Sequence, residues 1–452
     1  MRIVVAGCGK IGNSIIGSLN KEEHDLVVID QDPSIIAEVT NTYDLMSVCG
    51  NALEYETLKE AEIDKAEMFI AVTGSDEFNM LSCFLAKRMG ASQTIARIRT
   101  PEYNDKSLGF LRQQLDLSMS INPELLVASE LHNILKFPSA VKIETFSRRN
   151  FQMVELKIKE GSPVADLTVE EARKHFSAEF VICMVQRGEE ALIPDGKFKL
   201  QVGDRIGVCA TPTEIFKLMR QMGVLKSKAK NVMILGATRT SFYLAKMLAA
   251  SGTNVKIIDA DKSRCEEFAN ELDGVNMICG NGAEQEVLLE EGIDHYDAFV
   301  SLTGLDEQNI LISCYANSRN VPKVIAKVNS APLGDMAEKI GLDSIVSPQE
   351  TICNVIIQYA RALQNSLGSK VETLYKLLDG KVEALEFMVD SGFKYTNVPL
   401  KDMQLKPNTL IAGIVRGRKA IIPSGNDMIL PNDLIIVITS NEGLRDLSGI
   451  IK

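Results

Sequence analysis

MRIVVAGCGKIGNSIIGSLNKEEHDLVVID, residues 1–30, follows the order strand, glycine-rich turn, helix, strand and acidic residue. Residues 1–6 form a short apolar run rich in β-branched side chains, as expected of a buried parallel strand. Residues 13–19 have helical spacing, and residues 26–29 form a second apolar run that ends at Asp30. This order predicts a Rossmann-like α/β sheet with a nucleotide site at its first turn.

The turn, Gly7-Cys8-Gly9-Lys10-Ile11-Gly12, has the spacing G-x-G-x-x-G. Gly7 permits a tight turn, Gly9 lets the backbone approach a pyrophosphate, and Gly12 lets the helix pack closely on the strand. The pyrophosphate would lie at the helix N-terminus, where free N–H groups point outward. Asp30, 18 residues after Gly12, would accept hydrogen bonds from ribose hydroxyls and repel a 2′-phosphate. NAD(H) or an adenine nucleotide is therefore favoured over NADP(H); the alternative is a tight turn without ligand.

Further β/α units extend this first sheet. Strands are predicted at residues 44–49, 68–72 and 94–98, and helices at residues 55–61 and 79–89. In an open α/β sheet, ligands meet the carboxyl ends of the strands. Thr73, Gly74 and Arg97 are therefore expected near the same crevice as the glycine turn.

Two arginines, Arg97 and Arg99, come at the end of the fifth predicted strand. Because side chains alternate along a strand, at most one of the two is expected to point at the crevice. For such an arginine, a phosphate contact and a surface ion pair are equally plausible.

A small α+β domain follows the first sheet. Asn122-Pro123 predicts a helix start, with asparagine as N-cap and proline at the first helical position. Arg187-Gly188 and Asp195-Gly196 predict hairpin turns. The domain's strands are expected at residues 153–158, 180–186, 191–194 and 204–209, with a closing helix at 211–222 and a polar linker at 226–230.

The whole layout then repeats at a nearly constant offset. Gly236 and Asp259 lie 229 residues after Gly7 and Asp30. Residues 71–79 (AVTGSDEFN) correspond to residues 301–309 (SLTGLDEQN). Such an offset, held over some two hundred residues, predicts tandem duplication of a two-domain unit.

The second copy departs from the first at its turn, which reads Gly236-Ala237-Thr238-Arg239-Thr240-Ser241. A Cβ at Thr238 is expected to crowd a pyrophosphate. Asp259 retains the acid, and Arg239 could meet a phosphate. The sequence leaves open whether this copy binds a nucleotide or is structural.

Charge and composition exclude several classes of function. The 452-residue chain has a formal net charge of −11 and a pI of about 5.2, which argue against binding nucleic acid or lying directly on anionic lipid. No apolar run approaches the length of a membrane span, and the first strand begins at Met1, so no signal peptide is expected. The nine cysteines lack C-x-x-C spacing and the four histidines are scattered, which predicts reduced thiols in the cytoplasm and no metal cluster.

These residues together resemble a known family. The GCGKIG turn with Asp30, residues 72–80 (VTGSDEFNM), residues 95–101 (IARIRTP) and the hairpin-rich domain, in a duplicated layout, resemble the TrkA regulatory subunits of Trk potassium-uptake systems. Members of that family are built from tandem RCK (KTN) domains, each with a Rossmann half and a small C-terminal half. The resemblance covers essentially the whole chain.

The resemblance implies a cytoplasmic, homo-oligomeric regulator that binds NAD(H), or ATP and ADP at the same site. It would assemble as a ring of RCK units and dock on a membrane potassium-translocating subunit of the TrkH/TrkG type. The implied nucleotide contacts are Gly7 to Gly12, Asp30, Thr73, Gly74 and Arg97, and in the second copy Gly236 to Thr240, Asp259, Thr303 and Gly304. The expected parts are Rossmann domain 1 at 1–122, a boundary helix at 123–140, C-terminal domain 1 at 141–225, linker and Rossmann domain 2 at 226–346, a boundary helix at 347–370 and C-terminal domain 2 at 371–452.

Two other classes of function compete with a nucleotide-responsive regulator. An NAD-dependent dehydrogenase needs a proton-transfer group beside the nicotinamide, but no histidine follows a Rossmann strand. Tyr55 and Lys59 have the Tyr-x-x-x-Lys spacing of short-chain reductases, yet they come too early in the fold. A redox sensor could use Cys8, since a helix N-terminus lowers a thiol pKa, although a small residue in a variable loop position is the simpler interpretation.

The two boundary helices are expected to serve assembly rather than the core of the monomer. Each joins a complete Rossmann unit to a small domain, and residues 347–350 (SPQE) form a capping box. The second helix has an apolar face consisting of Ile352, Val355, Ile356, Tyr359 and Leu363.

Overall fold

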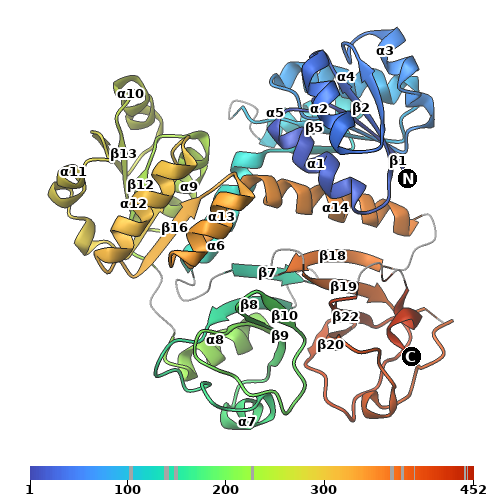
Figure 1. Cartoon of the computed structure of the whole chain (residues 1–452), viewed down its shortest axis with the longest axis vertical. Helices are drawn as coiled ribbons and strands as arrows, with labels where there is room; N and C mark the ends of the chain where they lie inside the picture. The colour runs from blue at the N-terminus through green and yellow to red at the C-terminus, as the bar shows by residue number, and fades with distance from the viewer. Residues whose placement is uncertain are drawn as a thin grey trace. The chain divides into compact units, whose positions relative to one another are not determined.

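The computed structural model describes residues 1–100, 105–136, 142–146, 151–224, 229–366, 371–377, 381–390, 392–441, 444 and 446–452 (Figure 1). Most of the predicted linker at 226–230 lies outside these residues. The chain forms two compact units. The first contains residues 1–129, 328–331 and 346–360, and the second contains the remainder.

The first unit is built on a six-stranded parallel sheet of order β3-β2-β1-β4-β5-β6. The order reverses direction between β1 and β4, which is where a doubly wound sheet opens a crevice. The sequence missed the short sixth strand and the helices α2 and α5. The elements are β1 (Arg2–Ala6), α1 (Lys10–Asn20), β2 (Asp25–Asp30), α2 (Pro33–Thr42), β3 (Met46–Cys49), α3 (Tyr55–Glu60), β4 (Met68–Ala71), α4 (Asp76–Met89), β5 (Gln93–Arg97), α5 (Asp105–Gln114) and β6 (Met119–Ile121).

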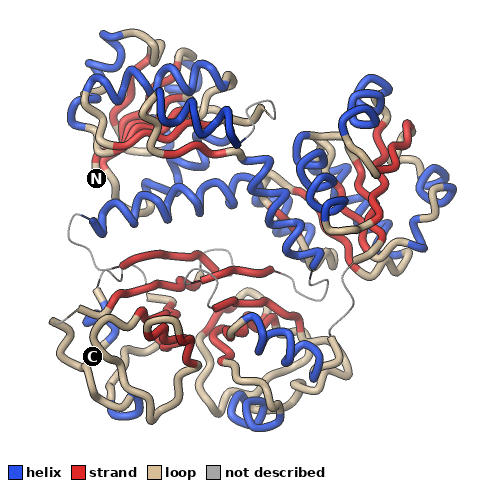
Figure 2. The backbone as a smooth tube through the Cα atoms, turned by 180° about the vertical axis from the view of Figure 1, so that it is seen from behind, coloured by secondary structure: helices blue, strands red, loops and turns tan. Residues whose placement is uncertain are grey.

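The core of this sheet explains its continuous apolar strands. Helices lie on both sides of the strands (Figure 2), so side chains pointing to either face are buried. All four residues of β4 are buried, as are the last four of β1. Val4 and Phe69 are among the buried residues of one cluster under α3 and α4.

A second Rossmann sheet repeats the first, in the order β14-β13-β12-β15-β16-β17. This confirms the predicted duplication of a doubly wound parallel-sheet domain. Its elements are β12 (Asn231–Leu235), α9 (Arg239–Ala250), β13 (Asn254–Asp259), α10 (Lys262–Glu271), β14 (Val275–Cys279), α11 (Gln285–Glu290), β15 (Ala298–Ser301), α12 (Asp306–Ser318), β16 (Lys323–Lys327), α13 (Ala331–Lys339) and β17 (Ile345–Val346).

Each copy also has a small five-stranded antiparallel sheet, of order β10-β9-β11-β8-β7 in the first and β18-β19-β22-β20-β21 in the second. Matching strands occupy matching places. The elements are β7 (Lys142–Phe146), β8 (Phe151–Lys157), α7 (Val169–His175), β9 (Val181–Arg187), β10 (Glu190–Leu192), β11 (Arg205–Ala210), α8 (Pro212–Gln221), β18 (Val371–Leu377), β19 (Val382–Met388), β20 (Thr409–Arg416), β21 (Lys419–Ile421) and β22 (Leu434–Thr439).

The strand pairing in the first small domain shows which of the two predicted hairpins forms. Arg187-Gly188 does join paired antiparallel strands, with Gly188 at a φ of +61°. The hairpin prediction at Asp195-Gly196 is wrong, because β10 pairs only with β9 and β11 pairs with β9 and β8. Asp195 instead accepts a hydrogen bond from the Lys197 N–H, which turns the chain without pairing two strands.

The boundary helices α6 (Pro123–Lys136) and α14 (Pro348–Ser366) are part of the core of the single chain. In α14, Ile352 and Ile356 are 1% and 0% exposed. Residues 346–360 belong to the first compact unit, where α14 runs past α1 (Figure 1). The expectation that these helices serve assembly rather than the core is therefore wrong for their buried faces.

Candidate functional site

The glycine turn of the first copy joins β1 to α1. Gly7 has a φ of +95°, and a Cβ there would lie 2.9 Å from the Thr73 backbone N, so the turn needs glycine for both reasons. Gly9 is the N-cap of α1, in extended conformation, and no side chain caps the helix. Lys10 and Ile11 begin the helix. Its N-terminal N–H groups are thus open to an external acceptor.

The other two glycines of the motif differ in what surrounds them. A Cβ on Gly12 would lie 1.9 Å from the Gly7 carbonyl oxygen, so no side chain fits at this contact between turn and helix. A Cβ on Gly9 would meet nothing within 4 Å. The space over Gly9 is therefore free, as the approach of a pyrophosphate requires.

Asp30 ends β2 and bonds to the glycine turn itself. Its Oδ2 accepts a hydrogen bond from the Cys8 N–H at 2.7 Å, and its Oδ1 accepts one from the Asp32 N–H at 3.0 Å. Each carboxylate oxygen has a further lone pair that could accept from a ribose hydroxyl. The carboxylate therefore holds the turn from the carboxyl end of β2.

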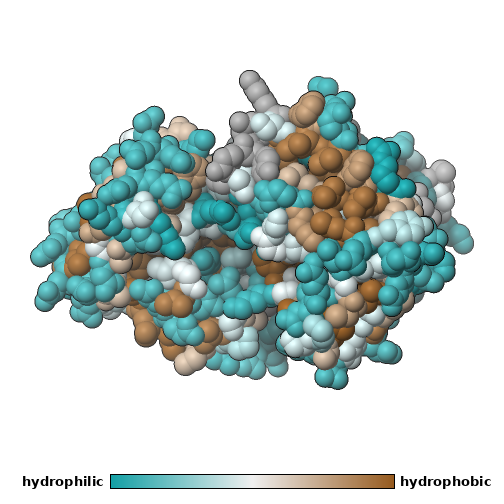
Figure 3. Space-filling model, turned by 90° about the horizontal axis from the view of Figure 1, so that it is seen from above, coloured by the Kyte–Doolittle hydropathy of each residue, from teal (hydrophilic) through white to brown (hydrophobic). Residues whose placement is uncertain are grey.

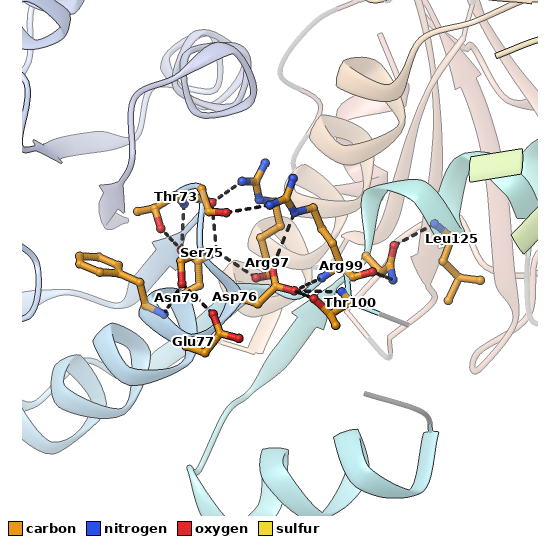
Figure 4. Close-up of polar contacts among 12 residues, drawn as sticks. Thr73, Ser75, Asp76, Glu77, Asn79, Arg97, Arg99, Thr100 and Leu125 are labelled. Carbon is orange, nitrogen blue, oxygen red and sulfur yellow. Dashed lines mark hydrogen bonds and ion pairs between the residues drawn. The ribbon is translucent and has the colours of Figure 1, made fainter. Parts of the chain in front are cut away.

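Asn79 on α4 binds the loop after β4 (Figure 4). Asn79 Oδ1 accepts hydrogen bonds from the Thr73 N–H at 2.8 Å and from its hydroxyl at 2.7 Å. Asn79 Nδ2 donates to the Arg97 carbonyl oxygen at 2.9 Å. The amide thereby links the ends of β4 and β5. A Cβ on Gly74, the next residue of the loop, would meet open space.

Both arginines reach this loop. Arg97 Nη2 donates to the Thr73 carbonyl oxygen, and Arg99 Nη2 donates to the Gly74 carbonyl oxygen at 2.7 Å. The prediction that at most one of them would point there is wrong, because residues two apart in a strand lie on the same face, and Arg99 lies beyond the end of β5. Arg97 is buried and Arg99 lies nearer the surface.

Asp76, at the start of α4, fixes the chain that follows β5. Its Oδ2 accepts from the Arg99 N–H at 2.9 Å, and from the Thr100 N–H at 2.9 Å and hydroxyl at 2.7 Å (Figure 4). Burial opposes ionisation, but these bonds and the Arg99 guanidinium hold the pKa of Asp76 below its ordinary value. Asn122 Nδ2 then donates to the Arg99 carbonyl oxygen at 3.4 Å. Polar contacts thus run from the Thr73 loop to the first turn of α6.

In the second copy, side chains of the turn itself bond to the helix N-terminus and to the turn backbone. Thr238 caps α9, accepting a hydrogen bond from the Ser241 N–H at 3.4 Å, and its hydroxyl lies 3.0 Å from that of Ser241. The Ser241 hydroxyl donates to the Gly236 carbonyl oxygen. The donors that α1 leaves open are therefore partly satisfied within α9. Arg239 is exposed, whereas Ala237 and Thr240 are buried.

Other hydrogen bonds around the two glycine turns occur at corresponding positions of the two copies. Asp259 Oδ2 accepts from the Ala237 N–H at 2.6 Å, as Asp30 does from Cys8. Asn309 Oδ1 accepts from the Thr303 N–H at 2.9 Å and from its hydroxyl at 2.7 Å. A Cβ on Gly304 would meet open space, as on Gly74.

The structure also places the residues of the competing interpretations. Cys8 is buried, and this burial, followed by the charge of Asp30, raises the pKa of its thiol to about 12. The lowered pKa that a redox sensor at Cys8 would need is therefore absent. Tyr55 is exposed on α3 with the Lys59 ammonium 5.9 Å from its ring centroid.

Sequence reasoning did not assign a role to Asn79 or Asp76. The signal was present, since Asn79 and Asn309 occupy matching positions of the repeat and both are fully buried. A buried amide that recurs at the same position of each copy indicates an internal hydrogen-bond network.

Comparison with known proteins agrees with this architecture. The TrkA-N domain model matches residues 3–111 and 232–348, and the TrkA-C domain model matches residues 153–223 and 384–452. The Trk system potassium uptake protein TrkA homolog of Archaeoglobus fulgidus is 31% identical over 100% of both chains. This chain belongs to the TrkA family. Another member, TrkA of Vibrio alginolyticus, is 28% identical over 98% of this chain and 96% of that one.

Solved structures resemble this TrkA-family chain in fold. The crystal structure of the GsuK RCK domain has a TM-score of 0.63 at 17% identity, covering 98% of this chain and 92% of that one. The GsuK channel bound to NAD has a TM-score of 0.64 at 16% identity, covering 98% and 77%. At these identities the likeness shows a shared tandem RCK fold.

Proposed function

We propose that the first crevice binds NAD(H) or an adenine nucleotide, with ATP and ADP at the same site. The observation that carries this proposal is the difference between the two helix N-termini: α1 has no side-chain cap, whereas Thr238 caps α9. The pyrophosphate lies over Gly9 against the N–H groups of α1, and the ribose hydroxyls bind Asp30. Thr73, Gly74 and Arg97 form the opposite side of the site.

In this proposal the second crevice does not take a pyrophosphate. A ligand there would have to displace the Thr238 hydroxyl from the Ser241 N–H and find room beside its Cβ. The proposed nucleotide site is therefore asymmetric within a symmetric repeat. In this proposal Gly236 to Thr240, Asp259, Thr303 and Gly304 do not form a nucleotide site.

The nucleotide would act as a signal rather than as a redox substrate. We infer a regulatory subunit that gates a membrane potassium-translocating partner. This is supported by the role of TrkA relatives in potassium uptake and by the RCK fold of the GsuK channel, whose structures include NAD and ADP complexes. No helix in the described ranges is long and apolar enough to cross a bilayer. The proposed location is the cytoplasmic face of the membrane, through the partner. As a non-enzyme, the protein should not oxidise NADH with any small substrate.

We also propose that the protein assembles as a homo-oligomeric ring. Corresponding helices of the two copies expose large apolar side chains: Phe110 on α5 is 62% exposed and Met336 on α13 is 60% exposed. Hydrophobic residues gather in places on an otherwise largely hydrophilic surface (Figure 3). The net charge of −11 favours contact with basic loops of a partner over contact with anionic lipid.

Calorimetric titration with NADH, NAD, ATP and ADP tests the site. Gly9→Val places a side chain against the pyrophosphate and should weaken binding more than tenfold, a loss of over about 1.4 kcal/mol. Asp30→Ala should weaken it through loss of the ribose contact. The matched control is Thr238→Val, at the corresponding position of the second copy, which should leave affinity and stoichiometry unchanged. Equal affinity in folded Gly9→Val protein would refute the site.

The regulatory role needs a separate measurement. Channel activity in reconstituted membranes should change with a nucleotide that binds, and the partner should shift nucleotide affinity by the same factor, typically corresponding to about 1–3 kcal/mol. Identical activity with and without a bound nucleotide would leave the ligand a structural role only.

A further inference from the structure

Two cysteines meet at the edge of the second Rossmann sheet, away from the glycine turns. Cys279 is the last residue of β14 and is exposed. Cys265 lies on α10 and is 6% exposed. They are 14 positions apart in the chain, and neither belongs to a C-x-x-C motif.

The fold brings these thiols together. Cys279 pairs in register with Asp259 on the neighbouring strand β13. Cys265 Sγ lies 3.3 Å from the Asp259 carbonyl oxygen and 3.8 Å from that of Ile278, the residue before Cys279. These contacts place the Cys265 sulfur beside the end of β14 that carries Cys279. The Cys279 thiol is therefore reachable from solvent, and the buried Cys265 thiol lies next to the end of its strand.

We propose that Cys265 and Cys279 form a dithiol site that a small-molecule disulfide oxidises to an intramolecular disulfide. The site would sit beside Asp259, the corresponding acid of the second copy, and would tie α10 to the end of β14. It would give the second copy a redox response in place of a nucleotide response.

The order of the two reaction steps follows from the unequal exposure of the two thiols. The Cys279 thiolate attacks the small disulfide, forms a mixed disulfide and releases one thiol. Cys265 loses its proton to solvent and attacks the Cys279 sulfur, which releases the second thiol. Two electrons pass from the protein sulfurs to the small disulfide. Burial, together with Cys279, raises the pKa of Cys265 to about 11, so Cys279 is the thiol that reacts first.

The first copy contains a natural control. Cys49 ends β3, pairs in register with Asp30 and is exposed, as Cys279 is in the second copy. The position corresponding to Cys265 is Ile36, which has no thiol. Cys49 is therefore an exposed thiol like Cys279, but no thiol occupies the position of Cys265 to attack a mixed disulfide formed on it.

The test treats the folded, full-length protein with oxidised glutathione and maps the products by mass spectrometry. A protease that cleaves after glutamate separates the two cysteines at Glu271. We expect a linked Cys265–Cys279 peptide pair with two hydrogens lost, and a lasting glutathione adduct on Cys49. Cys265→Ile, which copies the first repeat, should convert Cys279 to a lasting adduct like that of Cys49.

Two results would overturn the proposal. One is a glutathione adduct on Cys279 of the wild-type protein as persistent as that on Cys49. The other is no reaction at Cys279 under conditions that modify Cys49. Repeating the reaction in urea shows whether the fold directs the pairing, since the preference for this pair should disappear in unfolded protein.

Discussion

At the scale of single residues, three glycines of one motif have three different physical roles. Gly7 adopts a positive φ, Gly12 allows close contact with the Gly7 carbonyl oxygen, and Gly9 leaves free space over the helix N-terminus. At the position of Gly12 the second copy has Ser241, whose hydroxyl donates a hydrogen bond to the Gly236 carbonyl oxygen. The same place in the repeat thus carries either a close backbone contact or a closing hydrogen bond.

Gly12→Ala should destabilise the protein more than Gly9→Ala does. The alanine methyl at residue 12 would overlap the Gly7 carbonyl oxygen, and such overpacking costs about 1–3 kcal/mol. The alanine at residue 9 enters open space. Urea denaturation followed by circular dichroism measures both variants, and equal stability of the two would contradict this account of the turn.

Asp76→Asn should lower stability at pH 7, with a difference from wild type that disappears in acid. The pKa of Asp76 in the folded protein lies below its ordinary value of 3.8. Its contribution is therefore fully present above pH 3.8 and is lost as the pH falls through the folded pKa. Denaturation curves between pH 7 and pH 3 test this. Glu77→Gln, which removes a charge from the same helical turn, should show a smaller difference in stability. A difference for Asp76→Asn that does not narrow below pH 3.8 would argue against the assignment.

At the scale of elements, Asn122 joins the nucleotide loop to the boundary helix. Its Oδ1 accepts from the Leu125 N–H at 2.9 Å, which caps α6, and its Nδ2 reaches the Arg99 carbonyl oxygen. The corresponding residue in the second copy is Ser347, which caps α14 with its hydroxyl. The cap is thus common to both copies, whereas the amide donor occurs in the first.

Asn122→Ala should therefore cost about 1 kcal/mol through loss of the cap, while Asn122→Ser should restore most of it. Thermal unfolding gives both values. Asn122→Ser keeps the cap and removes the donor to Arg99, so it separates helix stability from the link to the loop. If nucleotide binding normally protects the first turn of α6 in hydrogen exchange, that protection should weaken in Asn122→Ser; unchanged protection would show that the link transmits nothing.

At the scale of the whole molecule, the two copies depend on each other. The N-terminal part of α14, from the second copy, belongs to the compact unit built on the first Rossmann sheet. Tyr359 donates to Gln93 on β5 at 3.0 Å, and Ser14 on α1 donates to Gln349 at 3.0 Å. Buried residues of the two small sheets also form one cluster, which includes Phe146 and Leu377.

Separating the copies should therefore destabilise the first. Residues 1–224 expressed alone lack α14 and should unfold at a lower temperature than the full chain, because surface that covers Ile352 and Ile356 becomes exposed. Co-expression with residues 229–452 should restore the transition. Calorimetry of both samples checks this; a melting temperature for residues 1–224 equal to that of the full chain would mean that the copies are independent.

The amino-acid sequence by itself determined the features that depend on the local pattern of residues. The glycine spacing with Asp30 predicted the first Rossmann unit, and the constant offset predicted its duplication, because periodicity and turns are properties of neighbouring residues. The missed α7 had a local signal as well, a capping box between Thr168 and Glu171. The false hairpin at Asp195-Gly196 shows the limit of that reasoning, since a turn sequence does not specify which strands pair.

Tertiary structure decided whatever depends on residues far apart in the chain. Only the folded chain shows that α14 packs in the unit of the other copy and that Cys265 lies beside the end of β14 that carries Cys279. The sequence predicted that Thr238 would crowd a phosphate, but the fold adds that its hydroxyl satisfies the Ser241 N–H. Whether a helix N-terminus stays open depends on how its side chains and backbone are placed in space, and the same repeat has therefore produced one helix without a side-chain cap, α1, and one with a cap, α9.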